Sequence, residues 1–270
     1  MVAVSASVGM FDSGLGGLTV ARAVIDLLPH EDLLYFGDTA RFPYGPRDPA
    51  EVRRFAFEIV DYLVAEGVKL IVVACNSAES AAFYEEVGRT DVVPIVTVIE
   101  PGVRTALAAT TNRKIGLIGT EATIRSQAYE AAFQRTRANV QLTARACPKF
   151  VEFVEAGDTT SDALMAAAVE YLTPIKDAGV DTLILGCTHY PLLSGVIQYV
   201  MGGDVVLVSS AEPTANEVYA RLLEADLLNH SDATGRMRFV VSADDATQLE
   251  LGRRFLGPEV TDLEIHEWAG

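Results

Sequence analysis

Two cysteines in this chain stand in nearly the same setting, one in each half. Cys75 follows an apolar run in LIVVACNSAES (70–80), and Cys187 does the same in LILGCTHYPLL (183–193). Each stands where a strand would end and a helix would begin, and a helix N-terminus stabilises a thiolate. A lone buried cysteine is usually core filler, which is our expectation for Cys147. For the matched pair, core filling and a shared chemical role both remain open.

Two thiols that face each other across a cleft suit one reaction well. A racemase takes a proton from one face of a carbon and returns a proton to the other face, so it needs a base and an acid that exchange roles. Cysteine can supply either form, because a free thiol is a few per cent ionised near neutral pH. Asp12 and His189 stand at similar strand ends and could exchange protons with the thiols. Asp12 could equally cap a helix, and His189 could serve packing.

Other chemistries fit the pattern less well. Zinc sites need spacings such as C-x-x-C, whereas only C-x-H occurs here, at Cys187 and His189. A cysteine hydrolase leaves the second thiol without a role, and a redox dithiol needs cysteines close in sequence. FDSGLGG and Asp38 resemble a dinucleotide fingerprint, but Thr19 stands where that motif needs its last glycine. What remains is a glycine-rich loop whose free amides could receive a carboxylate.

Short β-rich runs alternate with amphipathic stretches along the chain. Residues 49–67 are typical of a helix, with Pro49 at its start, Gly67 at its end and one apolar stripe. Continuous Val/Ile/Leu runs predict strands covered on both faces, and repeated β-α units predict a parallel sheet. The expected strands are 8–12, 32–38, 69–75, 93–99, 114–120, 140–147, 181–187, 204–210 and 236–244.

The two halves of the sequence echo each other. Cys75 and Cys187 are about as far apart in the chain as Asp12 and Thr120, which also end strands. This repetition predicts two duplicated α/β domains, although a single large sheet remains the alternative. We expect a first domain of residues 1–99 with 211–270, and a second of residues 100–210. Ligands of parallel sheets bind at the carboxyl ends of the strands, so the site should lie in the cleft between the domains.

Composition limits the class of protein. With 21 Lys and Arg against 37 Asp and Glu, the net charge is −16, which disfavours nucleic-acid binding. No apolar run is long enough for a membrane span, and the N-terminal segment lacks the features of a secretory signal. Three cysteines do not make a disulfide framework, so a reducing cytoplasm is the expected setting.

Four motifs together resemble the glutamate racemases, part of the cofactor-independent aspartate/glutamate racemase superfamily. They are FDSGLGGLTV, YFGDTARFPYG, VVACNSA and LGCTHYPLL, and they occur in the expected order along nearly the whole chain. The resemblance implies two flavodoxin-like domains related by pseudo-symmetry. It also implies interconversion of L- and D-glutamate without pyridoxal phosphate, any other cofactor or a metal, with D-glutamate supplied to peptidoglycan synthesis. Relatives commonly form dimers, so a homodimer is expected.

The resemblance also implies roles for individual residues. Cys75 would handle the proton of D-glutamate and Cys187 that of L-glutamate, with Asp12 and His189 assisting. Glu155 would support the second thiol, although Glu152 stands close enough to compete for this role. The implied substrate contacts are Asp12, Ser13, Tyr44, Gly45, Asn76, Ser77, Thr120, Thr188 and His189. Ser77 stands where most relatives have threonine, which keeps the hydroxyl. An aspartate racemase, or a glutamate-binding protein without turnover, remains an alternative.

Overall fold

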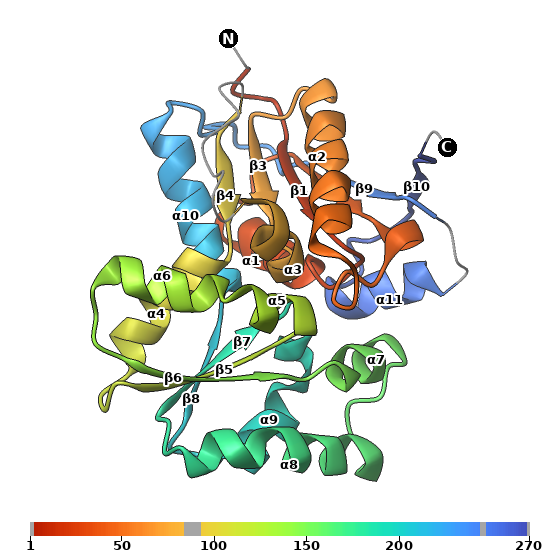
Figure 1. Ribbon diagram of the computed structural model, residues 1–270. Helices are drawn as coiled ribbons and strands as arrows, with labels where there is room; N and C mark the ends of the chain where they lie inside the picture. Colours follow the sequence, from red (N-terminus) through yellow and green to blue (C-terminus); the bar gives the residue numbers. More distant parts are fainter. Residues whose placement is uncertain (1–2, 84–92, 244–246, 269–270) are drawn as a thin grey trace.

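The computed structural model describes residues 3–83, 93–243 and 247–268, and within them the chain forms two parallel sheets surrounded by helices (Figure 1). The strand order is β10-β9-β2-β1-β3-β4 in the first sheet and β6-β5-β7-β8 in the second. All pairings between the described strands are parallel. The strands are β1 (Val8–Asp12), β2 (Leu33–Gly37), β3 (Leu70–Val73), β4 (Ile95–Thr97), β5 (Lys114–Gly119), β6 (Gln141–Ala146), β7 (Thr182–Gly186), β8 (Val206–Ser209), β9 (Met237–Val241) and β10 (Glu264–Ile265).

The predicted α/β class with two parallel sheets is confirmed. The segments β2-β1-β3-β4 and β6-β5-β7-β8 follow the same neighbour order, as expected of duplicated units. Each of the nine expected strands is present, shifted at its ends by no more than a few residues. Residue 244, the last of one expected strand, lies outside the described residues. The short edge strand β10 was not predicted, because two exposed residues carry no periodic signal.

The helices separate these strands along the chain. The longer ones are α1 (Leu18–Leu27), α2 (Pro49–Ala65), α4 (Ile99–Ala109), α6 (Ala128–Thr136), α7 (Lys149–Glu155), α8 (Asp162–Asp177), α9 (Ser194–Met201), α10 (Ala211–Glu224) and α11 (Gln248–Phe255). The shorter turns are η1 (Thr39–Arg41), α3 (Asn76–Ala78), the π-helical η2 (Glu79–Phe83), α5 (Glu121–Ser126) and η3 (Tyr190–Leu193). The helix predicted over 49–67 is α2. Asp48 caps its start by accepting a 2.8 Å hydrogen bond from Ala50 N, and Gly67 follows its end at φ +77°.

Both faces of the first sheet are covered by helices, which explains its continuous apolar strands. Met10 and Val72 belong to the core shared with α1 and α10. Their neighbours Phe11 and Val73 belong to the core shared with α2 on the opposite face. Successive side chains of one strand therefore enter different cores, and each strand is anchored on both sides.

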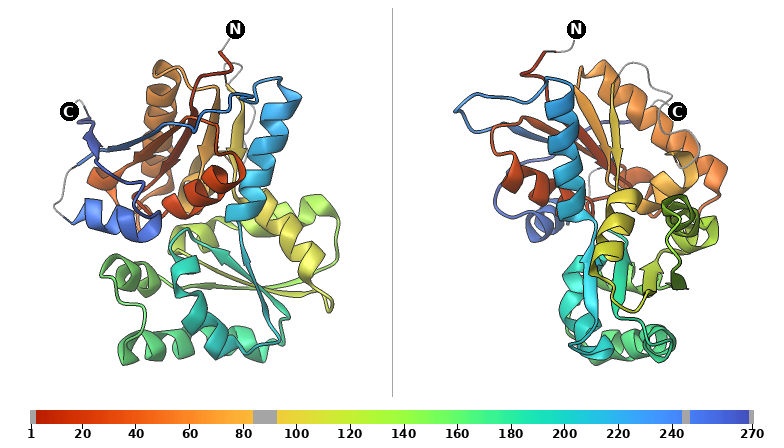
Figure 2. Two further views of the ribbon diagram at one scale, coloured as in Figure 1. Left: turned by 180° about the vertical axis from the view of Figure 1, so that it is seen from behind. Right: turned by 90° about the vertical axis from the view of Figure 1, so that its left-hand side faces the viewer.

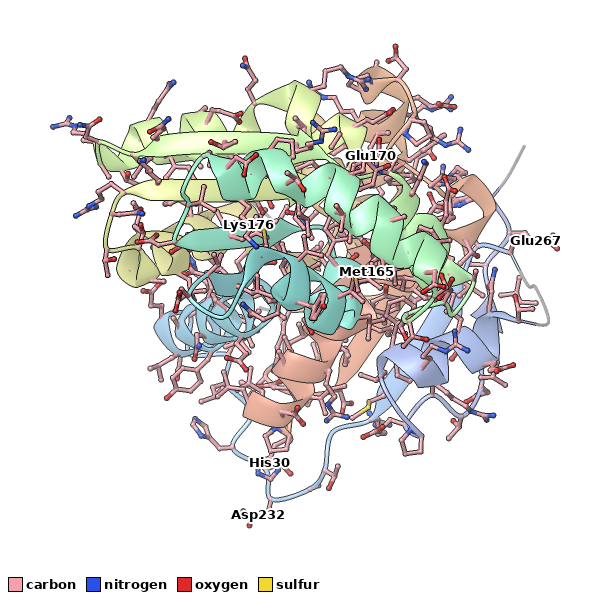
Figure 3. The ribbon with its side chains drawn as sticks, turned by 90° about the horizontal axis from the view of Figure 1, so that it is seen from below. His30, Met165, Glu170, Lys176, Asp232 and Glu267 are labelled. Atoms are coloured by element: carbon pink, nitrogen blue, oxygen red, sulfur yellow. The ribbon has the colours of Figure 1, made fainter. Side chains whose placement is uncertain are left out.

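The second sheet is covered in the same way. Ile115 and Ile184 pack with α4 and α6, while Leu183 and Leu185 pack with α8 and α9. Figure 3 shows α8 crossing the sheet, seen from below. Lys176 of α8 donates a 2.8 Å hydrogen bond to the backbone oxygen of Val200, which ties α8 to α9. Among the described residues, no helix is long and apolar enough to cross a membrane.

The chain passes between the two sheets twice. It leaves the first sheet after β4 through α4 and returns from β8 through α10. These helices lie side by side at the junction (Figures 1 and 2), where an ion pair of 2.7 Å joins Arg104 to Glu217. The expected crossings near residues 100 and 210 are thus located in the structure. The division into domains at 99/100 and 210/211 stays a prediction.

Candidate active site

A cavity of about 660 Å³ lies at the carboxyl ends of both sheets. Parallel strands bring the residues that follow them to one edge, and here the two edges face each other. Its lining includes every residue that the sequence analysis assigned to the site: Asp12, Ser13, Tyr44, Gly45, Cys75, Asn76, Ser77, Thr120, Glu155, Cys187, Thr188 and His189. The two thiols therefore border the same space.

Cys75 forms part of the wall contributed by the first sheet. It stands between β3 and α3, is buried, and its Sγ lies 3.6 Å from Ser13 Oγ. Burial raises the pKa of the Cys75 thiol, and the negative charge of Asp12 raises it further. Hydrogen bonds from the Ala78 and Ser13 backbones partly oppose this shift. In the free protein Cys75 therefore carries its proton at neutral pH.

Asp12 is held by the glycine-rich loop that follows β1. Its Oδ2 accepts hydrogen bonds from the backbone N–H of Gly14 at 3.2 Å and of Gly17 at 3.1 Å. A Cβ on Gly17 would lie 2.6 Å from the Cβ of Asp12, so the loop needs glycine to approach the carboxylate. The sequence predicted that the amides of this loop would be free to bind a carboxylate. Two of them bind Asp12 instead, because its side chain folds back over the turn.

Cys187 directly follows β7 on the opposite wall, and His189 contacts it. Cys187 Sγ lies 3.8 Å from His189 Nδ1, and His189 Nε2 lies 2.6 Å from Glu155 Oε1. Burial disfavours the charged imidazole, but the hydrogen bonds to Cys187 and Glu155 outweigh it and raise the pKa of His189 to about 10. His189 is therefore protonated at neutral pH and can return a proton to the thiolate form of Cys187.

Glu155 and Glu152 both lie on α7 and both line the cavity. The carboxylate in contact with His189 is that of Glu155, as the sequence analysis favoured. The side chain of Glu155 is 27% exposed while that of His189 is only 3% exposed. Glu155 thus connects the buried imidazole to solvent.

Two hydrogen bonds join elements of the first sheet to elements of the second beside the cavity. Ser77 Oγ lies 2.8 Å from Thr120 Oγ1, so the hydroxyl of Ser77 contacts the end of β5. Tyr129 of α6 donates a 2.7 Å hydrogen bond to Asn76 Oδ1. The buried Nδ2 of Asn76 has no partner among the described residues. The lining thus offers hydroxyls and an amide donor to an anionic ligand.

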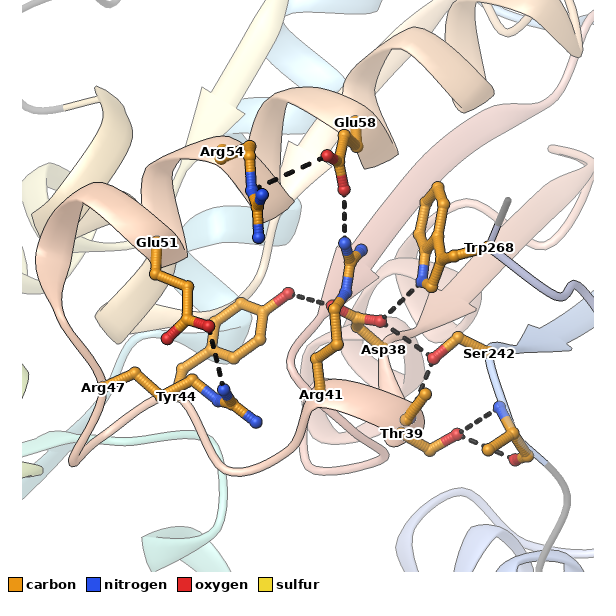
Figure 4. A network of polar contacts seen from close by, with 12 residues as sticks. Asp38, Thr39, Arg41, Tyr44, Arg47, Glu51, Arg54, Glu58, Ser242 and Trp268 are labelled. Carbon is orange, nitrogen blue, oxygen red and sulfur yellow. Dashed lines mark hydrogen bonds and ion pairs between the residues drawn. The ribbon is translucent and has the colours of Figure 1, made fainter. Parts of the chain in front are cut away.

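The loop that carries Tyr44 and Gly45 is anchored by Asp38 (Figure 4). The hydroxyl of Tyr44 donates a hydrogen bond to the buried carboxylate of Asp38. Ser242 and Trp268 donate to the same carboxylate from the C-terminal part of the chain, at 2.8 and 3.0 Å. In a dinucleotide site Asp38 would bind a ribose. Here its carboxylate accepts these three hydrogen bonds and fixes the loop.

Arg41 completes this anchor. Its guanidinium lies 2.7 Å from Asp38 Oδ2 and also contacts Glu58. The rings of Phe55 and Trp268 each lie 4.1 Å from the guanidinium carbon, as a pair of cation–π contacts. Within the described residues, no group of three or more His, Cys, Asp or Glu side chains is arranged to hold a metal ion.

The fold and the site together define a two-sheet α/β protein with paired thiols in one cavity. Residues 18–218 match the family model described as Asp/Glu/Hydantoin racemase. The chain is 56% identical to glutamate racemase of Beutenbergia cavernae over 96% of this chain and 92% of that protein. It is 55% identical to glutamate racemase of Acidothermus cellulolyticus over 94% of this chain and 96% of that protein. The chain belongs to the Asp/Glu/hydantoin racemase family, and it is an amino-acid racemase, an isomerase.

Solved structures agree with this assignment. Glutamate racemase of Francisella tularensis in complex with D-glutamate superposes with a TM-score of 0.91 at 33% identity, covering 98% of both chains. Glutamate racemase of Thermus thermophilus in complex with β-chloro-D-alanine gives 0.87 at 43% identity, also over 98% of both chains.

Several residues that support the cavity lining were not predicted from the sequence. Tyr129 and Arg41 were not singled out, and Asp38 was considered only as a possible nucleotide ligand. Glu79 is a further case: it is buried behind α3, and its Oε2 accepts hydrogen bonds from the backbone N–H of Val98 and Ile99 at 2.8 and 2.9 Å. Burial raises the pKa of Glu79 to about 7. Glu79 stands in ACNSAESAAF, among Asn76, Ser77 and Ser80, so no signal in the sequence indicates that its carboxylate is buried.

Proposed function

We propose that this chain interconverts L- and D-glutamate by a two-thiol proton transfer at the α-carbon, without an organic cofactor. The observation that carries the proposal is that Cys75 and Cys187, from opposite sheets, line one cavity. The family membership and the identities to glutamate racemases support the substrate.

In the forward step, the thiolate of one cysteine takes the α-proton, so that an S–H bond forms as the C–H bond breaks. The electron pair left on carbon spreads into the α-carboxylate, where hydrogen-bond donors stabilise it. The thiol of the other cysteine then delivers its proton to the opposite face. A new C–H bond forms as that S–H bond breaks, and the two cysteines have exchanged protonation states.

Before substrate binds, the two cysteines have different proton-bearing surroundings, as a two-base transfer requires. Cys75 is a neutral thiol because burial and Asp12 raise its pKa, so it is ready to donate. Cys187 has a protonated imidazole at its side, which can exchange a proton with it. We assign Cys187 to the proton of L-glutamate and Cys75 to that of D-glutamate, with Asp12, His189 and Glu155 assisting.

The cavity offers a small anion polar contacts rather than a strong positive field. Ser77, Thr120 and Thr188 supply hydroxyls, and Asn76 supplies an amide donor. Ser13 and the Tyr44–Gly45 loop complete the wall that we assign to the substrate. Such dipoles hold a carboxylate despite the acidic surface of the protein, because they act at short range.

We further propose that the product D-glutamate serves peptidoglycan synthesis, and that the enzyme acts in the cytoplasm as a homodimer. These proposals rest on the resemblance of the four motifs to glutamate racemases.

Incubation of the purified protein with D-glutamate in D2O, without added cofactor, tests the proposed reaction. We expect L-glutamate that carries deuterium at the α-carbon, because the donating thiol exchanges with solvent. L-Glutamate without deuterium would contradict a two-base transfer. Turnover of aspartate in preference to glutamate would indicate an aspartate racemase. Tight binding of glutamate without isomerisation would indicate a binding protein.

A further inference from the structure

Only one end of the Asn76 side-chain amide has a hydrogen-bond partner within the described residues. Its Oδ1 accepts a 2.7 Å hydrogen bond from Tyr129, whereas its Nδ2 is buried without a partner in the described part of the chain. Asn76 is 3% exposed and lines the cavity. A buried donor without an acceptor is unfavourable, so a ligand oxygen placed opposite Nδ2 would restore the missing bond.

Tyr129 decides which end of this amide is free. It lies on α6, is fully buried, and packs in the core that covers the second sheet. Burial raises the pKa of Tyr129 well above its ordinary value, and the nearby Glu79 and Cys187 add to the effect. The hydroxyl therefore keeps its proton and acts as a donor. A donor selects the oxygen of an amide, which leaves the NH2 group for other acceptors.

We propose that Tyr129 is a positioning residue, which orients Asn76 so that Nδ2 donates to a carboxylate of the substrate. The donor, Asn76, belongs to the first sheet, and the residue that orients it, Tyr129, belongs to the helices of the second sheet. The carboxylate contact is therefore available only while α6 stays against the loop of Cys75 and Asn76. The inference rests on the proposed function, because the acceptor is the carboxylate of an amino acid.

Tyr190 provides a matched control. It is also fully buried, also belongs to the second sheet's side of the molecule, and its hydroxyl also donates one hydrogen bond, 2.9 Å long, to the backbone oxygen of Cys147. Tyr190→Phe and Tyr129→Phe therefore remove equivalent hydroxyls, and of the two hydroxyls only that of Tyr129 bonds to a residue of the cavity lining.

The experiment measures kcat and KM for both enantiomers of glutamate. We expect Tyr129→Phe to raise KM about tenfold with kcat changed by less than about threefold, and Tyr190→Phe to leave KM within about twofold. In an Asn76→Ala background, Tyr129→Phe should have no further effect on KM, because its action passes through Asn76. Equal KM values for the two tyrosine variants, or an undiminished effect in the Asn76→Ala background, would overturn the proposal.

Asn76→Asp tests the same idea if Tyr129→Phe fails to fold. The substitution keeps an oxygen for Tyr129 and places a second oxygen where Nδ2 stood, so KM should rise about 100-fold. An unchanged KM would show that Nδ2 is not the donor. If the unsubstituted protein does not racemise glutamate, the proposed function fails. If it does racemise glutamate and these variants keep their KM, the proposed function stands and the roles of Asn76 and Tyr129 fail.

Discussion

The imidazole of His189 is joined to the carboxylate of Glu155 by a hydrogen bond of 2.6 Å between Nε2 and Oε1. This contact turns the other ring nitrogen toward Cys187 and places a negative charge behind the ring. A carboxylate at this distance favours the protonated imidazole, which is the form able to return a proton to sulfur.

Glu155→Gln should move the alkaline limb of the pH–rate profile. The pKa of His189 is raised to about 10, so the protonated ring is present below that pH and is lost above it. Without the Glu155 charge we expect the limb in kcat/KM for D-glutamate, the direction in which Cys187 donates its proton, to shift to lower pH by about one unit. Glu152→Gln, on the same helix, is the control and should leave the limb in place. Identical profiles for the two variants would contradict the assignment.

Glu79→Gln should change how stability depends on pH. Burial raises the pKa of Glu79 from 4.5 to about 7, so the folded state holds this proton more tightly than the unfolded state does. The wild-type protein therefore loses stability relative to Glu79→Gln as pH rises from 4.5 to about 7. Across this window we expect the difference in Tm between the two proteins to change by about 5 °C or more.

The groups around the Glu79 carboxylate are mostly polar backbone atoms and side chains. Its oxygens face the backbone at Val98 and Ile99 and the side chain of Thr97, and the negative charge of Glu100 raises its pKa further. Glu100→Gln is the control, because Glu100 is exposed and pairs with Arg135 at 2.8 Å. If the Tm difference between Glu79→Gln and wild type stayed constant between pH 4.5 and about 7, the raised pKa of Glu79 would be refuted.

Gly16→Ala should damage catalysis more than folding. A Cβ at this position would lie 2.6 Å from Thr188 Oγ1 and would also meet the ring of His189. The ring of His189 or the Gly16 loop must move, and a displacement of about 1 Å at a group that takes part in catalysis costs about 100-fold in kcat. Gly195→Ala is the control, since a Cβ there meets no atom within 4 Å. Normal kcat in Gly16→Ala would show that the placement of His189 does not limit the reaction.

Substitution of each cysteine by serine separates the thiols by role. Cys75→Ser and Cys187→Ser should each lower the rate of racemisation by about 1000-fold or more, because a hydroxyl is a far weaker acid than a thiol. Cys147→Ser should leave the rate largely intact. Cys147 is also buried, but its Sγ contacts the backbone oxygen of Arg145, 3.7 Å away, and it does not line the cavity described above.

The positions of the two thiols could be predicted from the sequence because a local signal places them. Cys75 and Cys187 end apolar strands, and in a parallel sheet the carboxyl ends share one edge. The choice between Glu152 and Glu155 needed coordinates. The two lie less than one helical turn apart, and which of them meets His189 depends on how α7 sits against η3.

Residues that act across the cleft leave no such signal. Tyr129 looks like a core aromatic, and its partner Asn76 stands 53 positions away. The anchor of Asp38 joins residues more than 200 positions apart, Ser242 and Trp268 among them. The contact of Tyr129 with Asn76 depends on the docking of one sheet against the other. The Asp38 anchor depends on the strand order β10-β9-β2 within the first sheet. The period of a strand or helix encodes neither.

Single-thiol variants test the opposed placement of Cys75 and Cys187 most directly. With Cys75→Ala incubated in D2O, the remaining thiol should exchange the α-proton of L-glutamate only, and with Cys187→Ala that of D-glutamate only. Neither variant should form the opposite enantiomer, which NMR and chiral chromatography together would establish. Exchange of the same enantiomer by both variants, or racemisation by either, would show that the two sulfur atoms do not act on opposite faces of the α-carbon.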